Sequence, residues 1–162
     1  MIYLKTAVLI ASSMKIGALL GNCPTADEMT IYDLGIHLGL AFQLQDDYFD
    51  CFADENIFGK KIGDDILDAK KTFLYITAYQ SIEDEKDKQD FYNLYNDKNI
   101  NNDDKINKVI DIYKKLNIDK KTEEQIDYHI MKTQNNIDLL SLDKEKKSLL
   151  KNVIDVIANR SK

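Results

Sequence analysis

Apolar positions recur along this chain with the period of an amphipathic helix. Near the start, Val8, Ala11 and Lys15 fall on one helical face, with further small and apolar residues beside them. The pattern predicts a first helix over 3–20, and Gly21 ends it. The pattern therefore predicts that the chain begins with a helix.

Polar residues that precede apolar runs mark the starts of further helices. Thr25 with Glu28 forms a predicted capping box, which opens a long apolar helix over 26–52. Asp64 or Asp65 is predicted to cap a third helix that continues through Tyr79. The remaining predicted helices cover 84–96, 103–117, 122–140 with Thr122 and Gln125 as a second capping box, and 143–159 with Asp143 as N-cap.

The residues that break helices are confined to the first part of the chain. All six glycines lie at or before Gly63, the single proline is Pro24, and neither type occurs from Asp64 to Lys162. Hairpins and βαβ units usually need such residues at their turns. We therefore predict an all-α fold, a helical bundle within one domain that covers 1–162.

Composition and charge exclude several classes of protein. The chain has 162 residues, 44% of them hydrophobic and 31% charged, with a net charge of −6. This charge argues against nucleic-acid binding, and we see no apolar run near the ~20 residues of a transmembrane helix. Cys23 and Cys51 are too few for a disulfide framework or a zinc site. We expect neither signal peptide nor membrane span, and a cytoplasmic location.

A cluster of carboxylates lies at the end of the long apolar helix. Residues 35–45 are almost entirely apolar and lead into Asp46, Asp47 and Asp50. Asp46 and Asp50 lie one turn apart, and two carboxylates about 4 Å apart repel by roughly 4 kcal/mol at an effective dielectric of about 20. Oxygen ligands favour Mg²⁺, whose coordination substrate phosphates usually complete. The alternative is a solvated acidic helix end.

The following loop adds basic and acidic residues. Gly59 and Gly63 flank Lys60 and Lys61, and Asp64 and Asp65 come directly afterwards. Glycines allow tight turns, lysines contact phosphate, and a second carboxylate pair can complete metal binding. Alternatively, Asp64 is only an N-cap, and Lys70 with Lys71 are solvated helix residues. Both histidines, His37 and His129, favour a packing or surface role.

Together these motifs resemble the trans-isoprenyl diphosphate synthases, the polyprenyl synthetase family. The resemblance is carried by Lys5-Thr6, by Phe42-Gln43 followed by Asp46-Asp47 and Asp50, by Gly59 to Asp65, and by Lys70-Lys71-Thr72. It covers about residues 3–75 and points to the short-chain type, such as farnesyl or geranylgeranyl diphosphate synthase. It implies the C-terminal portion of the isoprenoid synthase fold.

The resemblance also implies a role for each matching residue. Asp46, Asp47, Asp50 and Asp65 would hold Mg²⁺, and Lys5 and Lys60 would contact the allylic diphosphate. Thr6 and Gln43 would lie near the carbon that becomes cationic, and Phe42 would line the isopentenyl site. Lys70 and Arg160 would contact substrate. The implied reaction joins dimethylallyl or geranyl diphosphate to isopentenyl diphosphate. The family also implies a homodimer.

One family element is missing from this sequence. The first aspartate-rich motif would precede Lys5, where only four residues stand, and Asp103-Asp104 lies too far downstream to replace it. We therefore expect the C-terminal half of a synthase that is inactive by itself. A non-catalytic helical subunit, or a truncated homologue that modulates a full-length synthase, is the alternative function.

Overall fold

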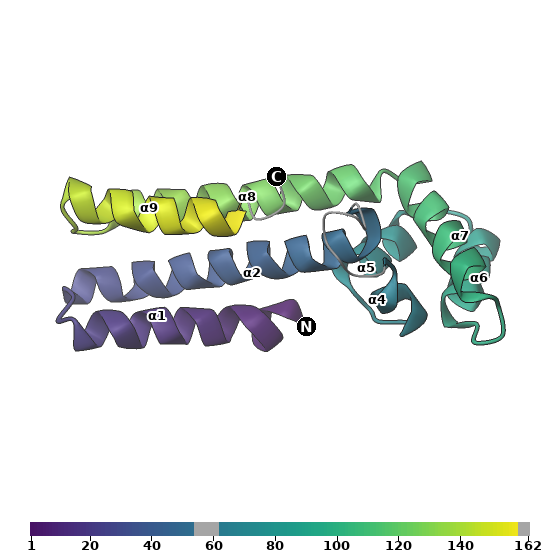
Figure 1. Cartoon of the computed structure of the whole chain (residues 1–162), viewed down its shortest axis with the longest axis horizontal. Coiled ribbons are helices and arrows are strands. Elements are labelled where there is room, and N and C mark those ends of the chain that lie inside the picture. The colour runs from purple at the N-terminus through teal and green to yellow at the C-terminus, as the bar shows by residue number, and fades with distance from the viewer. Residues whose placement is uncertain (54–61, 159–162) are drawn as a thin grey trace. The chain divides into compact units, whose positions relative to one another are not determined.

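The computed structural model describes residues 1–53 and 62–158, and these confirm the all-α prediction, since they contain helices and no strand (Figure 1). The α-helices are α1 (Val8–Leu20), α2 (Glu28–Phe52), α4 (Asp64–Leu67), α5 (Phe73–Ser81), α6 (Glu85–Asn96), α7 (Asn102–Lys115), α8 (Ile118–Leu139) and α9 (Lys144–Ala158). A π-helical turn, Tyr3–Ala7, leads into α1, and a 3₁₀ turn, Thr25–Asp27, leads into α2.

The chain forms two compact units. The first combines residues 1–44 with 125–162, and the second is the continuous segment 45–124. Helix α2 therefore begins in the first unit and ends in the second, and α8 returns the chain to the first. The assignment of 1–162 to a single domain stays a prediction.

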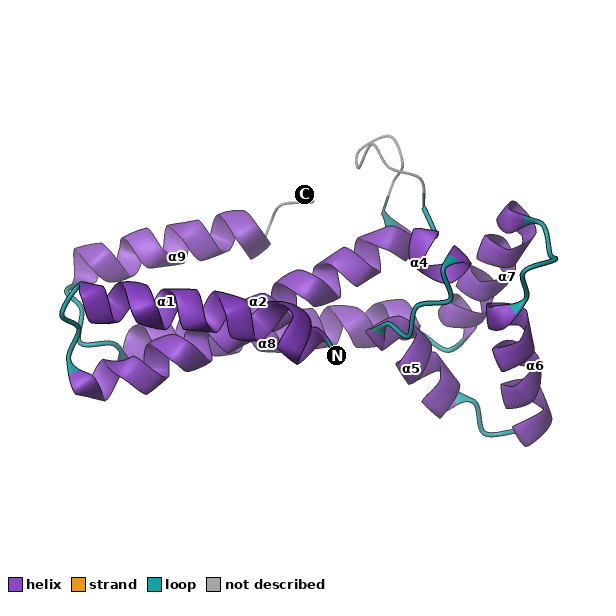
Figure 2. Cartoon of the chain, turned by 90° about the horizontal axis from the view of Figure 1, so that it is seen from below, coloured by secondary structure: helices purple, strands orange, loops and turns teal. Residues whose placement is uncertain are grey.

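Four helices lie alongside one another in the first unit (Figures 1 and 2). Their apolar faces meet in a core to which each helix contributes. Its fully or nearly fully buried members are Leu34 and Leu38 of α2, Ile137 of α8, Leu140 after α8, and Ile154 of α9, with Ile10 and Met14 of α1 packed against them. Burial of these aliphatic side chains stabilises the bundle by about 1.5–3 kcal/mol for each one.

Small residues allow α1 and α2 to approach closely. A Cβ atom added at Gly35 would lie 2.5 Å from the Cα atom of Ala11, and one added at Gly39 would lie 2.6 Å from the Cα atom of Ala7. Ala7 and Ala11 are both completely buried. The two glycines, one turn apart, thus form a groove on α2 that receives the backbone at the start of the first helical segment.

Aromatic side chains dominate the core of the second unit. The rings of Tyr75 and Tyr95 lie 4.3 Å apart, those of Tyr75 and Phe91 lie 5.4 Å apart, and Phe91 packs edge-on against Tyr113. All four are buried. Tyr75 therefore belongs to the core and joins α5 to α6.

Two predicted capping boxes are wrong. The side chain of Thr25 makes no capping bond, and α2 begins at Glu28 after the 3₁₀ turn. The buried Asp27 carboxylate instead accepts hydrogen bonds from the backbone N–H and the hydroxyl of Ser141. Thr122 lies inside α8, where its hydroxyl donates to the carbonyl of Ile118. Threonine can satisfy its hydroxyl within a helix in this way, so its presence does not fix a helix start.

The predicted third helix is also wrong in its extent. It ends at Leu67, and α5 begins only at Phe73, after a break in which Ala69 has a φ angle of 51°. Neither Asp64 nor Asp65 caps α4, because the N-cap position is Gly63, with a φ angle of 93°. Thr72 caps α5 by accepting a hydrogen bond from the backbone N–H of Tyr75 at 3.4 Å.

The later helix starts agree better with the sequence. Asp84 caps α6 by accepting from the backbone N–H groups of Lys86 and Asp87. Asp143 accepts from the N–H of Lys146 before α9, as predicted. Asn101, which the sequence prediction passed over, caps α7. Local side-chain chemistry thus determined these three starts.

One helical stretch, Tyr3–Leu20, is long and apolar enough by composition to cross a membrane, and 11% of it is buried. Its buried residues face α2, while Leu4, Leu9 and Leu20 are at least 70% exposed. The expected absence of a membrane span stays a prediction, since length and composition alone do not distinguish a span from a helix that packs in a bundle.

Candidate active site

The end of α2 presents its aspartates to different surroundings. Asp46 is exposed, Asp47 is 5% exposed, and Asp50 is half-buried. Consecutive helical residues point about 100° apart, so a helix that is buried on most sides up to Leu44 exposes only part of this cluster. The acidic end of α2 is therefore not a uniformly solvated surface.

The start of α4 is attached to Asp50. Its carboxylate oxygen Oδ2 accepts a hydrogen bond from the backbone N–H of Asp65 at 3.0 Å, and its backbone carbonyl accepts from the N–H of Gly63 at 2.7 Å. The structure thus brings together two predicted metal ligands, Asp50 of α2 and Asp65 of α4, which lie 15 residues apart in sequence.

This position raises the pKa of Asp50 to about 6. Burial is the largest cause, and the negative charges of Asp65 and Asp64 add to it, while the hydrogen bond from the Asp65 N–H and the charge of Lys70 act in the opposite direction. Burial and like charge both disfavour the ionised carboxylate. A cation at this place would favour ionisation of Asp50.

Lys70 lies within this cluster. Its ammonium group forms ion pairs with Asp65 Oδ1 and, at 3.4 Å, with Asp68 Oδ2. The hydrogen bond to Asp65 is the main reason that the pKa of Lys70 is raised. Lys70 keeps nearly half of its side chain exposed, so it can still reach a bound anion. Lys70 lies between α4 and α5 and not in a helix, and its role in substrate binding stays a prediction.

Tyr95 supports this turn from α6. Its hydroxyl donates to the backbone carbonyl of Lys70 at 2.7 Å and lies 3.4 Å from that of Asp65. The sequence pattern does not single out Tyr95, because its spacing from Phe91 is that of an ordinary core residue. Only its position in the tertiary structure identifies the contact.

The first unit brings together a second pair of predicted residues. The Thr6 hydroxyl donates a hydrogen bond to Gln43 Oε1 at 2.7 Å, between the π-helical turn and α2. Gln43 is buried and Phe42, beside it, is half-buried, whereas Lys5 is exposed. Because Thr6 donates its proton to Gln43, the lone pairs of the hydroxyl oxygen remain available to a positive centre.

Two predicted site residues lie outside the described part of the chain. They are Lys60 and Arg160. Within residues 1–53 and 62–158, no group of three or more carboxylate, histidine or cysteine side chains is arranged to hold a metal ion by itself.

The donors present nevertheless fit Mg²⁺. They are carboxylate oxygens on α2 and α4, and burial, followed by the negative charges of Asp65 and Asp64, raises the pKa of Asp50, so a cation would stabilise its ionised form. Mg²⁺ is commonly held by one or two carboxylates, several waters and the phosphates of the substrate, so three protein ligands are not required.

A family model for polyprenyl synthetase matches residues 1–113. The chain belongs to the polyprenyl synthetase family. The match includes every predicted site residue except Arg160.

Among curated relatives, the short chain isoprenyl diphosphate synthase of Methanothermobacter thermautotrophicus is 42% identical over 89 residues, which are 55% of this chain and 27% of that relative. The geranylgeranyl diphosphate synthase of Sulfolobus acidocaldarius is 42% identical over 87 residues, 53% of this chain and 26% of that relative.

Solved structures extend the similarity of this polyprenyl synthetase chain beyond the matched segment. A geranylgeranyl pyrophosphate synthase superposes with a TM-score of 0.86 at 32% identity, over 99% of this chain and 50% of that one. The geranylgeranyl pyrophosphate synthetase of Pyrococcus horikoshii gives 0.87 at 29% identity, over 99% and 47%. The fold is the all-α isoprenoid synthase fold, and the chain spans about half the length of these structures.

Proposed function

We propose that this polyprenyl synthetase chain is part of a Mg²⁺-dependent short-chain prenyltransferase. The enzyme would join an allylic diphosphate, such as dimethylallyl or geranyl diphosphate, to isopentenyl diphosphate and yield farnesyl or geranylgeranyl diphosphate. The observation that carries the proposal is the Asp50–Asp65–Lys70 cluster, which offers two carboxylates to a cation and one ammonium group to an anion bound to that cation.

The carboxylates and lysines would bind the diphosphate. Asp46, Asp47, Asp50 and Asp65 would hold Mg²⁺, while Lys5, Lys60 and Lys70 would contact phosphate oxygens, as the family resemblance implies. When bound, Mg²⁺ would neutralise the charge that develops on the departing diphosphate. Arg160 would contact the second diphosphate.

Thr6 and Gln43 would act on the organic part of the substrate. Heterolysis of the allylic C–O bond leaves positive charge on carbon, and oxygen dipoles directed at that carbon stabilise it. The hydrogen bond from Thr6 to Gln43 fixes both oxygens, so little reorganisation is needed during the reaction. Phe42 would line the isopentenyl site and help to exclude water.

A complementation assay tests this proposal. The purified 162-residue chain would be incubated with geranyl and isopentenyl diphosphates and Mg²⁺, alone and together with the portion of the Methanothermobacter relative that lies outside the match. We expect no turnover from the chain alone, and farnesyl diphosphate formation when the missing carboxylate cluster is supplied. Removal of one preorganised charge contact typically costs about 10²–10³ in rate, and here a whole cluster is absent.

An Asp46→Ala chain provides the control in that assay. It should give no product even with the added portion. Stimulation of a full-length synthase by both the wild-type and the Asp46→Ala chains would instead favour the non-catalytic modulating subunit. A cytoplasmic location and a homodimer are further parts of the proposal, and sedimentation of the chain with the added portion tests the latter.

A further inference from the structure

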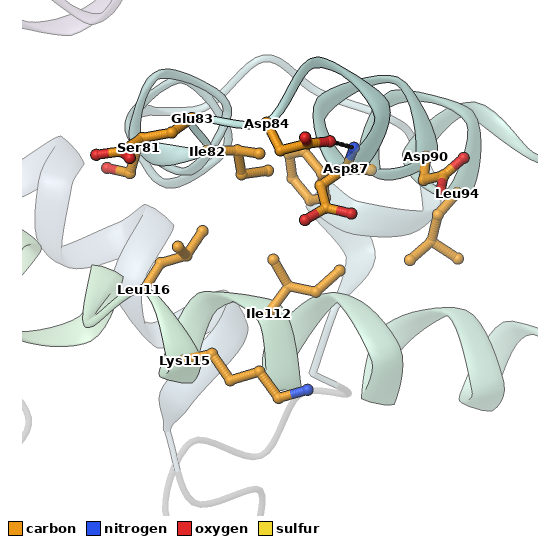
Figure 3. A pocket seen from close by; sticks show the side chains of 11 residues that line it. Ser81, Ile82, Glu83, Asp84, Asp87, Asp90, Leu94, Ile112, Lys115 and Leu116 are labelled. Atoms are coloured by element: carbon orange, nitrogen blue, oxygen red, sulfur yellow. Dashed lines mark hydrogen bonds between the residues drawn. The ribbon is translucent and has the colours of Figure 1, made fainter.

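The second unit contains a cleft that the proposed chemistry does not use. Its volume is about 630 Å³, and it lies between α6, the end of α7 and the segment that follows α5 (Figure 3). The residues that line it are Ser81, Ile82, Glu83, Asp84, Asp87, Asp90, Phe91, Leu94, Ile112, Lys115 and Leu116. None of them belongs to the carboxylate cluster at Asp50.

The interior of the cleft is apolar. Ile82 on one side, and Ile112 and Leu116 on the other, extend toward one another, and Leu94 also points inward (Figure 3). These aliphatic side chains are only half-buried, whereas Phe91 is 2% exposed. Coverage by a partner would therefore remove further apolar surface from water, which favours binding.

The rim of the cleft is acidic. Glu83, Asp84, Asp87 and Asp90 are exposed along the start of α6. Asp84 is engaged as the N-cap, whereas Asp87 points into the cleft, and no cation among the described residues forms an ion pair with Asp87 or Asp90. Lys115 is the single cation among the described lining residues, and it extends away from the rim (Figure 3).

The spacing of these carboxylates indicates what could bind. Asp84, the N-cap, and Asp87 and Asp90 of α6 are three residues apart, so each step in this row rises about 4.5 Å along the helix axis. Basic residues one turn apart on another helix have a similar spacing of about 5.4 Å. The row is about 9 Å long, which is more than one cationic group of a small molecule can contact.

We propose that this cleft docks a basic amphipathic helix of another protein. The apolar positions of that helix, at intervals of three to four residues, would enter between Ile82 and Leu116, and its Lys or Arg side chains would pair with Asp87 and Asp90. The opposite charges would also increase the rate of association.

A second copy of this chain is the less suitable occupant. Its own basic amphipathic helix, α9, uses Lys146 in an ion pair with Asp143 and Lys151 in an ion pair with Asp138.

Titration with a model helix tests the proposal. The probe is a dye-labelled peptide of about four helical turns, with leucines at i, i+4 and i+7 and lysines beside them; an isomer of the same composition has these positions shuffled. Both are titrated with the 162-residue chain at about 0.15 M salt. We expect saturable binding of the amphipathic peptide and at least about tenfold weaker binding of the isomer.

Matched variants locate the binding. Asp87→Asn with Asp90→Asn should weaken binding about tenfold, whereas Glu124→Gln with Asp127→Asn, which removes two exposed carboxylates from α8, should change it less than about twofold. Leu116→Lys, which places a cation inside the cleft, should weaken binding by a similar factor. Circular dichroism of each variant verifies folding, and because Asp87 and Asp90 are exposed, their variants should fold.

Three results would overturn the proposal. Equal weakening of peptide binding by the double variant of α6 (Asp87→Asn with Asp90→Asn) and by that of α8 (Glu124→Gln with Asp127→Asn) would mean non-specific attraction to a negatively charged protein. Equal affinity for the shuffled isomer would mean that no apolar face is recognised. Concentration-dependent self-association that is abolished by Asp87→Asn with Asp90→Asn would identify a second copy as the occupant.

Discussion

The imidazole rings of His37 and His129 meet with their Nδ1 atoms 2.8 Å apart, across α2 and α8. The ring centroids lie 5.1 Å apart, close to the largest separation possible at that Nδ1–Nδ1 distance, so the two atoms point at one another. One ring must donate a proton and the other must accept it. The pair is therefore intact only while at least one of the two histidines is neutral.

The histidine pair makes the stability of the first unit depend on pH. Burial and the neighbouring His37 lower the pKa of His129 to about 4 from an ordinary value of 6.5, and burial lowers that of His37 against the opposing effect of Asp33. The folded state binds these protons less tightly than the unfolded state does. The contribution of the pair to the free energy of unfolding is therefore fully present above pH 6.5 and decreases as the pH falls toward 4. We expect a loss of about 1–2 kcal/mol for this half-exposed pair.

Urea unfolding of the wild-type chain and of His129→Gln between these pH values measures the effect. The difference in free energy of unfolding between the two proteins should shrink as the pH falls, because the variant lacks the titrating group. A difference that does not change with pH would contradict the role assigned to this pair. Carboxylates titrate in both proteins and cancel in the comparison.

Gly35→Ala should destabilise the first unit by about 1–3 kcal/mol, because the new Cβ would lie 2.5 Å from the Cα atom of Ala11 and the helices would have to separate. Gly17→Ala is the matched control, since nothing lies within 4 Å of a Cβ at that position in α1. It should stabilise the chain by about 0.5–1 kcal/mol. Urea unfolding distinguishes the two, and equal effects would show that α1 and α2 are not in close contact.

Asp50→Asn should reduce Mg²⁺-dependent binding of pyrophosphate by more than about tenfold, while stability at pH 7 should not fall. The amide oxygen can still accept the hydrogen bond from the Asp65 N–H, and the repulsion from Asp64 and Asp65 disappears. Mg²⁺ alone should bind weakly to the wild-type chain. Calorimetric titration with each ligand, and with both, measures these affinities.

Asp143→Ala is the control for Asp50→Asn, because it should lower stability and not the affinity for pyrophosphate. It removes the N-cap of α9, so it should cost about 0.5–2 kcal/mol of stability and leave pyrophosphate binding unchanged. Similar effects of Asp50→Asn and Asp143→Ala on binding would reject the assignment of the metal ligands.

Tyr95→Phe should destabilise the second unit by about 1 kcal/mol, because the backbone carbonyl of Lys70 loses its hydrogen bond from the hydroxyl. Amide exchange at Lys70 should become faster, since the turn in which its N–H bonds to Asp65 is less firmly held. Tyr92→Phe, at an exposed tyrosine of the same helix, should change neither quantity. Unaltered exchange in Tyr95→Phe would show that the turn is held without α6.

The sequence by itself determined the fold class and the family, and it predicted the residues of the candidate site. The absence of Gly and Pro after Gly63 excluded a β-rich fold, and the helical period placed most of the elements. Asp143 was identified as a cap because its hydrogen bond reaches only three residues along the chain. The family could be inferred from short motifs because metal and phosphate binding require particular residue types at fixed spacings.

Only the tertiary structure decided which groups meet across helices. The bond from Asp65 to Asp50, the support of Lys70 by Tyr95 and the pairing of His37 with His129 join segments 15 to 92 residues apart. Thr25 and Thr122 have the sequence pattern of caps, but tertiary packing gave Asp27 a partner at Ser141 and placed Thr122 inside α8. A local preference for a cap or a helix is worth about 1 kcal/mol, which is less than the free energy gained when a whole helical face is buried. The order of residues along the chain shows only in part which faces are buried.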